Sequence, residues 1–195
     1  RGTFNNWDHT DPVISTMHAS LAQALFGILV AYAAVSAPGW QVAPMEGAPR
    51  GLARWAKALA ALVYAQIVLG AVMRHQHAGL IIPDFPANYG HVIPTFYNWL
   101  VALNFAHRCG AWLLVSFGTA LAWRVAADKS LDPWVRQPAW VLLGAIAAQF
   151  LLGACVVWTQ LGLPILTSAH VLGGAVVFTS ALVLALRLGR ASQGA

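Results

Sequence analysis

Charged residues are scarce in this chain. Only 9% of its 195 residues are charged and six are acidic, whereas 59% are hydrophobic and the mean hydropathy is +0.65. So few polar groups cannot cover the surface of an ordinary soluble domain. Both cysteines, Cys109 and Cys155, fall inside apolar runs, which indicates small buried residues and no disulfide framework. None of the apolar runs has the short core and cleavage site of a signal peptide.

Long apolar runs are abundant instead. A membrane core about 30 Å thick requires roughly 20 apolar residues per helix, and five runs satisfy this: residues 13–36, 54–73, 97–123, 138–158 and 164–187. The chain is therefore predicted to be an all-α integral membrane protein with five transmembrane helices. It opens at Arg1 without a methionine, so we expect further sequence upstream.

The cations cluster in three regions between and after these runs: Arg50, Arg54 and Lys57; Arg124, Lys129 and Arg136; Arg187 and Arg190. Positive residues favour the cytoplasmic side, so we expect a multi-pass protein of the cell membrane with its N-terminus outside and its C-terminus in the cytoplasm. The net charge of +5 is explained by this topology, and it gives no reason to expect nucleic-acid binding.

Parts of the sequence repeat. "AQIVLGAV" (65–72) resembles "AQFLLGAC" (148–155), which pairs Gln66 with Gln149 and Gly70 with Gly153. The first and last runs also match, since each carries a histidine near the same side of the membrane. Chance recurrence of common membrane residues is the alternative.

This repetition predicts a domain organisation. Residues 1–37 form an outer segment and the last helix of a preceding, incomplete four-helix half, and residues 38–53 are a cytoplasmic linker. Residues 54–187 form a C-terminal four-helix half, and residues 188–195 are a cytoplasmic tail.

Three histidines, His18, His107 and His170, lie within the runs. At 1.5 Å per residue, His170 falls about 9 Å and His107 about 15 Å below the outer helix ends. A polar ring at such depth is costly unless it is paired or bound. A neutral histidine bonded to a neighbouring helix is the alternative for any one of them, but three on different helices favour ligation.

Haem is a better candidate ligand than zinc. Zinc requires four donors from Cys, His or carboxylate, and no acidic residue lies deep in a run. Two imidazoles can instead hold a porphyrin iron from both sides. The second ring nitrogen of His170 then needs a partner, such as Thr167, Ser168 or a backbone carbonyl. Small residues are expected to leave room for the macrocycle: Gly110, Gly173 and Gly174.

Two arginines lie where the haem propionates would need partners. Arg108 follows His107 deep in its run, and an arginine binds carboxylates in bidentate fashion. Arg74, at the outer end of the second run, is expected to do the same or to reach the interface as a snorkelling side chain.

The segment "RHQHAGLIIPDFPANYGHVIP" (74–94) separates the second and third runs. Its three prolines oppose regular helix, so we predict a structured loop over the outer face. Asp84 is interpreted as a turn residue, with a cofactor contact as the alternative. His75 and His77 are interpreted as loop residues, with a metal-binding pair as the less favoured reading.

Taken together, "LGAVMRHQHAGLIIPDFP", "AHR" and "SAHVLGG" occur in the order found in haem A synthases, and the chain resembles this family over essentially its whole length. The resemblance implies an eight-helix protein of two pseudo-symmetric halves that oxidises a methyl group of haem O to the formyl group of haem A. Two departures are Ile82 and Phe85, where many members have cysteine and tryptophan, so a redox role for the loop is unsupported.

The resemblance also implies roles for residues. His107 and His170 are the expected axial ligands of a b-type haem, with Arg108 and Arg74 binding it. His18 is the expected ligand of the substrate haem O, and its partner histidine and an essential glutamate would lie upstream. A bis-histidine iron has no open position for O₂, so the b-type haem is expected to transfer electrons or to have a structural role.

Partners follow from this reading. They are haem O, haem O synthase, the lipid bilayer, an unidentified electron donor and a second copy of the chain. The rival function is a quinol-linked membrane cytochrome b that transfers electrons without modifying haem. A transporter whose histidines only pack helices is a third possibility.

Overall fold

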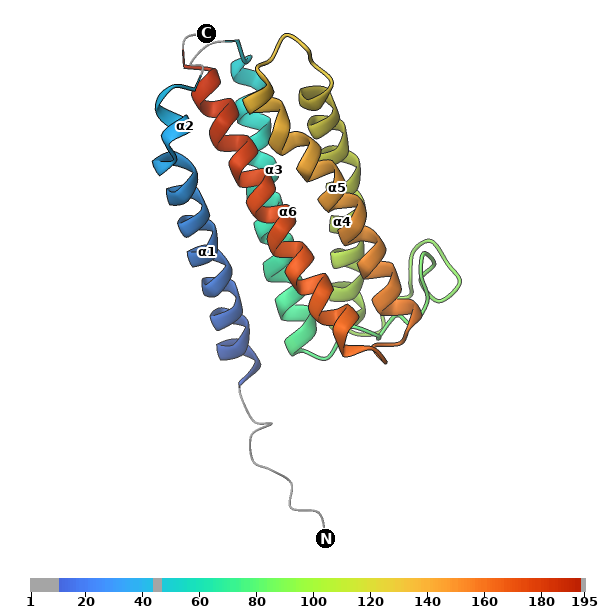
Figure 1. Ribbon diagram of the computed structural model, residues 1–195. Helices are drawn as coiled ribbons and strands as arrows, with labels where there is room; N and C mark the ends of the chain where they lie inside the picture. Colours follow the sequence, from blue (N-terminus) through green and yellow to red (C-terminus); the bar gives the residue numbers. More distant parts are fainter. Residues whose placement is uncertain (1–10, 44–46, 194–195) are drawn as a thin grey trace.

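The computed structural model describes residues 11–43 and 47–193 (Figure 1). Its long helices are α1 (Pro12–Ser36), α3 (Arg50–His75), α4 (Trp99–Ala126), α5 (Pro133–Trp158) and α6 (Pro164–Ala191), and a short α2 (Pro38–Gln41) follows α1. All five long helices are long and apolar enough to cross a membrane, and no strand occurs in the described part of the chain. The prediction of an all-α membrane protein with five spans is confirmed.

Four of the helices form a ring. α3 packs against α4 and α6, and α5 packs against the same two helices, whereas the backbones of α4 and α6 make no close approach within the described residues. α4 and α6 therefore occupy diagonal corners of a four-helix bundle. α1 lies outside this ring against α3 and α6 (Figure 1).

The bundle has two distinct ends. At one end α3 and α5 finish and α4 and α6 begin, and this end carries the loop 76–98 (Figure 1). It contains the predicted histidines, and we call it the histidine end. The opposite end, with α2 and the C-terminus, contains the three cationic regions, and we call it the cationic end.

Helix boundaries follow local capping. Asp132 accepts a hydrogen bond from the Trp134 N–H at 2.7 Å, and Pro133 occupies the first turn, where its missing N–H has no cost. α5 consequently begins at Pro133 and includes Pro138, whereas the apolar run predicted a start at 138. The apolar run is shorter than the helix because the first turn of α5 contains polar residues, Arg136 and Gln137, that are helical but not apolar.

The closed core lies toward the cationic end. Gly118 of α4 allows two neighbours to meet there, since a Cβ at this position would lie 2.8 Å from Ile146 Cδ1 and 3.4 Å from Leu59 Cδ1. Fully buried aliphatic side chains come from all four ring helices: Leu59, Val125, Val135, Leu142, Leu184 and Leu188. This packing fixes the spacing of the four helices at the cationic end.

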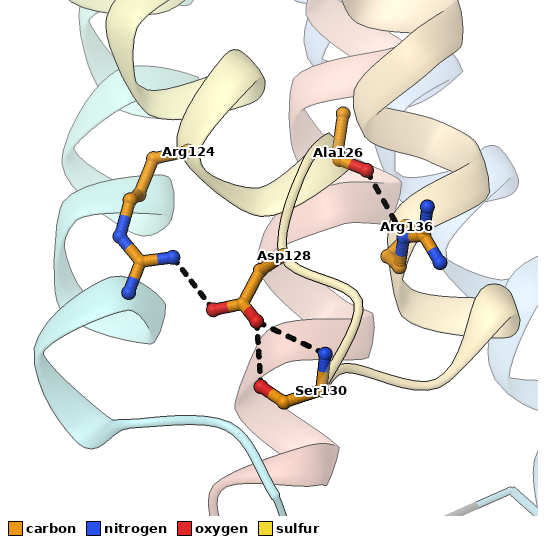
Figure 2. Close-up of polar contacts among 5 residues, drawn as sticks. All are labelled: Arg124, Ala126, Asp128, Ser130 and Arg136. Carbon is orange, nitrogen blue, oxygen red and sulfur yellow. Dashed lines mark hydrogen bonds and ion pairs between the residues drawn. The ribbon is translucent and has the colours of Figure 1, made fainter.

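The α4–α5 turn closes the cationic end (Figure 2). Asp128 accepts hydrogen bonds from the Ser130 hydroxyl at 2.6 Å and from Arg124 Nη1 at 2.6 Å, and Arg136 Nε donates to the Ala126 carbonyl at 3.0 Å. The Ser130 hydroxyl and the Arg124 guanidinium lower the pKa of Asp128 to about 2. The carboxylate therefore stays ionised and holds the turn throughout the physiological range.

α1 is attached through a small contact surface. A Cβ at Gly27 would lie 2.6 Å from Phe178 Cε1 on α6, and Phe178 is itself buried beside Tyr64, with ring centroids 5.5 Å apart. The Tyr64 hydroxyl donates to the Ser20 carbonyl of α1 at 3.1 Å. Gly27 therefore sets how closely α1 approaches the ring.

We predict that Gly27→Ala destabilises the protein by about 1–3 kcal/mol, because the added methyl overpacks against a buried ring. Thermal unfolding in detergent measures this as a lower midpoint. Gly144→Ala is the matched control, since a Cβ there meets nothing within 4 Å, and it should be neutral or slightly stabilising. Equal midpoints for the two variants would refute the packing role of Gly27.

Candidate functional site

His107 and His170 each pack against a glycine of the preceding helix. A Cβ at Gly70 on α3 would lie 3.0 Å from His107 Cε1 on α4, and a Cβ at Gly153 on α5 would lie 3.0 Å from His170 Cε1 on α6. The same contact thus occurs in two helix pairs. Only glycine permits an imidazole to approach the neighbouring backbone this closely.

A glutamine accompanies each histidine. A side chain at Gly110 would collide with Gln66 Oε1, and a side chain at Gly173 would collide with Gln149 Oε1. These glycines admit a glutamine from the adjacent helix. That they also leave room for a macrocycle stays a prediction. In the sequence, Gln66 and Gln149 stand out only as members of the repeat. Their position one helical turn before Gly70 and Gly153 is the signal that could have indicated a role beside the histidines.

The polar contacts of the two pairs differ. Gln66 Nε2 donates to the His107 carbonyl at 2.7 Å and lies 3.1 Å from His107 Nδ1. In the second pair, His170 Nδ1 and Gln149 Oε1 are both buried without a hydrogen-bond partner among the described residues. The expected partners Thr167 and Ser168 do not bond to His170 Nδ1.

The two histidines belong to diagonal helices. α4 and α6 are separated by α3 and α5, so the imidazoles come from opposite corners of the ring. Both imidazoles and the glycines beside them remain partly exposed, although Val101 and Asn104 of α4 at the same end are fully buried. Each imidazole is therefore only partly covered by protein side chains.

His18 lies apart from this pair. It is exposed on α1, outside the ring. Within residues 11–43 and 47–193, no three His, Cys, Asp or Glu side chains lie close enough to hold a metal ion together. His75 and His77 are included in that search, so they form no such cluster with a third residue.

Arg108 connects α4 to the loop 76–98. Its Nη1 donates to the carbonyls of Asp84 at 2.6 Å and Ala87 at 2.9 Å, and its Nη2 donates to the Ile82 carbonyl at 2.7 Å. Its Nε donates to Asn104 Oδ1 at 2.8 Å. Carbonyl groups of the loop thus accept most of the hydrogen bonds of the guanidinium, and the loop is the structural partner of this deep arginine. Propionate binding by Arg108 remains a prediction.

Asn104 extends the same connection. Only 2% of it is exposed, and its amide donates to the carbonyls of Ala78 at 2.8 Å and Gly79 at 3.2 Å. The sequence analysis missed this residue, although a polar side chain one helical turn before Arg108 in an apolar run was a usable signal. Together Asn104 and Arg108 confirm that the loop is structured.

Asp84 forms a turn within the loop. Its carboxylate accepts the backbone N–H groups of Tyr89 and Gly90, each at 2.8 Å, which confirms the turn interpretation. Both residues have positive φ, 56° and 75°. Burial alone raises the pKa of Asp84, but the hydrogen bonds from Gly90 and Tyr89 outweigh it, and the pKa is lowered.

Tyr89 closes the loop on its other side. Its hydroxyl contacts the Ile81 carbonyl and the Tyr97 hydroxyl, the latter at 2.7 Å. The hydrogen bond with Tyr97 and burial raise the pKa of Tyr89 to about 12. The phenol therefore remains neutral and available as a hydrogen-bond donor.

An aromatic cluster joins the loop to α4 and α5. The ring of Phe85 lies 6.4 Å from Trp112, 5.8 Å from Phe150 and 6.2 Å from Trp158, measured between centroids. Trp158 Nε1 also donates to the Phe85 carbonyl at 3.1 Å. These contacts hold the loop across the histidine end.

Arg74 occupies the last turn of α3 and is exposed. No hydrogen bond of its guanidinium is formed within the described residues. It lies at the histidine end, where propionate binding stays a prediction.

These features define a class: a multi-pass membrane protein with paired, glycine-flanked histidines at one end of a four-helix bundle, under a structured loop. The COX15-CtaA family model, described as "Cytochrome oxidase assembly protein", matches residues 4–182, and the chain belongs to this family.

Curated relatives agree. The chain is 31% identical over 185 residues to a "Heme A synthase" of Caulobacter sp. (strain K31), covering 89% of this chain and 52% of the relative. It is 28% identical over 186 residues to one of Nitrosospira multiformis, covering 89% and 51%. The chain thus spans about half the length of these relatives. No solved structure matches the chain.

We predict that Arg108→Gln loosens the loop 76–98. Losing hydrogen bonds to a charged donor costs about 1.5–3 kcal/mol each, so amide hydrogen exchange at residues 78–90 should accelerate at least tenfold. Arg108→Lys should have an intermediate effect, because it keeps the charge but not the planar fork. The exposed Arg74→Gln is the control, and equal exchange in the two Gln variants would contradict the role of Arg108.

A second prediction concerns pH. Because the folded-state pKa of Asp84 lies below its ordinary value of 3.8, the ionised carboxylate stabilises the turn above pH about 4. This stabilisation is lost as the pH falls through the folded-state pKa. Protection of the Tyr89 and Gly90 amides, corrected for intrinsic exchange, should therefore be constant above pH about 5 and fall below pH about 4.

Asp84→Asn provides the comparison. It should reduce protection already at pH 7 and remove most of the pH dependence, whereas Asp132→Asn at the other end of the bundle should leave these amides unchanged. A pH dependence that persists in Asp84→Asn would assign it to another group.

Proposed function

We propose that this chain forms the C-terminal, haem-binding half of a haem A synthase, with His107 and His170 as axial ligands of a resident b-type haem. The carrying observation is the repeated contact in which each histidine packs against a glycine of the preceding helix, on diagonal helices of one bundle. Two imidazoles in opposite corners match the ligand set of a bis-histidine iron.

The residues present fit such a group. Both imidazoles are only partly covered by side chains, and His170 has a buried Nδ1 with no hydrogen-bond partner in the described residues. When bound, a haem supplies one-electron redox chemistry at this level. The protein contributes the two imidazoles, the surrounding apolar helices and the loop that restricts water.

Each imidazole must present a free Nε2 lone pair, so its proton must lie on Nδ1. At His170, Nδ1 is buried without a hydrogen-bond partner among the described residues, and so is Gln149 Oε1 on the adjacent helix. We expect an oxygen of Gln149 to accept the Nδ1 proton in the ligating form. At His107, Gln66 Nε2 faces Nδ1, so ligation requires the Gln66 amide to reorient. We therefore expect the two glutamines to determine which ring nitrogen of each histidine carries the proton when the iron is bound.

The activity follows from the relatives. Proteins named "Heme A synthase" cover most of this chain, which supports oxidation of a haem O methyl group to a formyl group as the function of the whole protein. We assign His18 to the haem O site of the other half. In support, α1 leaves one continuous face exposed, with Ile14, Leu21, Ile28 and Tyr32 on the same side as His18.

We also propose a domain organisation, a membrane orientation and partners for this chain. Residues 54–187 are the C-terminal half, and residues 1–37 belong to the preceding one. The cationic end faces the cytoplasm of a cell membrane, and the histidine end faces outside. Arg74 and Arg108 are the candidate propionate partners, and haem O synthase and an electron donor are the expected protein partners.

We predict that His107→Ala and His170→Ala each abolish a low-spin b-type signal in the reduced-minus-oxidised spectrum of the purified protein. Loss of one axial imidazole removes the low-spin state and most of the affinity. His77→Ala, in the loop, is the matched control and should retain the signal. Unchanged haem content in both ligand variants would refute the assignment.

Product analysis separates the enzyme from a simple electron carrier. With a haem O source, the whole protein should yield hydroxymethyl and formyl haems, identified by mass after extraction. A b-type spectrum without these products would favour the membrane cytochrome b. A protein that stays colourless after haem supplementation would indicate that the histidines only pack helices.

A further inference from the structure

Two connected grooves lie at the cationic end, far from the histidines. One, of about 510 Å³, runs between α3 and α6 under Trp40 of α2. The second, of about 460 Å³, adjoins it, and the two share Lys57 and Gln193. Together they form one surface with two chemically different parts.

The mouth of this surface is cationic. Lys57 and Arg190 line the first groove, and Arg50 and Arg54 join Lys57 in the second. No acidic residue lines either groove among the described residues, which exclude Glu46. Four cations within a few helical turns attract an anion more strongly than a single interfacial arginine does.

Arg190 has one N–H group that donates no hydrogen bond to any described residue. Its guanidinium carbon Cζ lies over the Trp40 ring, 5.3 Å from the ring centroid, and its Nη2 donates to the Gln41 carbonyl at 3.2 Å. Its Nε is buried without a hydrogen-bond partner. A buried N–H without an acceptor is costly, so an oxygen-bearing ligand would stabilise this arrangement.

The inner part of the first groove is apolar. It is lined by Ala61, Tyr64, Phe178 and Leu182. Along α6, Phe178 lies about 18 Å from Arg190 at 1.5 Å per residue. This is close to the thickness of one leaflet of hydrocarbon, about 15 Å. The groove therefore matches a ligand with an anionic head and a hydrocarbon chain.

We propose that this surface binds one anionic glycerophospholipid, with its phosphate at Lys57 and Arg190 and an acyl chain along α3 and α6 toward Phe178. Basic pockets between transmembrane helices recognise such head groups. Free phosphate would use only the mouth, and the choline of a zwitterionic lipid would meet repulsion from the same cations. The proposal is independent of haem binding.

The test is native mass spectrometry of the detergent-solubilised protein titrated with dioleoyl phosphatidylglycerol or dioleoyl phosphatidylcholine. We expect tighter binding of the anionic lipid. Lys57→Gln and Arg190→Gln should each weaken phosphatidylglycerol binding about fivefold, as expected for one cation near an anionic head group. Lys129→Gln, on the α4–α5 turn at the same end, should have no such effect.

The acyl-chain part has its own variant. Ala61→Trp keeps every cation but fills the apolar groove from an exposed position, so it should also weaken phosphatidylglycerol binding. Equal affinities for the two lipids, or equal effects of Lys57→Gln and Lys129→Gln, would overturn the proposal. Full competition by inorganic phosphate together with a silent Ala61→Trp would identify an anion site without a lipid. Thermal midpoints verify that each variant is folded.

Discussion

Hydrocarbon cannot accept or donate hydrogen bonds, and the structure is organised around this constraint. Backbone groups are satisfied within five long helices. Polar side chains inside the bundle must then find partners in the protein, and Arg108 does so by binding the carbonyls of a loop that has no regular secondary structure of its own. The loop and the arginine therefore depend on each other, since each satisfies groups that lipid would leave unpaired.

The same constraint explains why the two ends differ. At the cationic end, aliphatic side chains close the core and fix the helix spacing. At the histidine end, glycines bring imidazoles and glutamine amides against neighbouring backbones, and some of these buried polar atoms have no partner among the described residues. The cationic end is thus held by apolar packing, whereas the histidine end contains polar groups that can still form hydrogen bonds.

The parts of this architecture that depend on composition could be predicted. Apolar runs located the five spans, and position within those runs singled out His18, His107 and His170. The structure gives His107 and His170 equivalent glycine contacts and leaves His18 exposed outside the ring. Features that depend on which residues contact each other in the folded structure could not be predicted. The partner of Arg108 is a set of backbone carbonyls, which leave no trace in the sequence. Gly110 was correctly noticed as small, but its reason, the side chain of Gln66, required knowing which faces of α3 and α4 meet. Likewise, the start of α5 depends on the Asp132 cap and not on hydrophobicity.

The repeat is also informative where it is broken. Both helix pairs share a glycine against the histidine and a glycine beneath the glutamine, so their backbones meet alike. The polar atoms nevertheless differ, because Gln66 bonds to His107 while Gln149 Oε1 and His170 Nδ1 lack partners among the described residues. The two helix pairs therefore share the same backbone packing but differ in the hydrogen bonds of their histidine and glutamine side chains. The two imidazoles are thus equivalent in position but not in hydrogen bonding, and His170 Nδ1 could accept a new partner without the loss of an existing hydrogen bond.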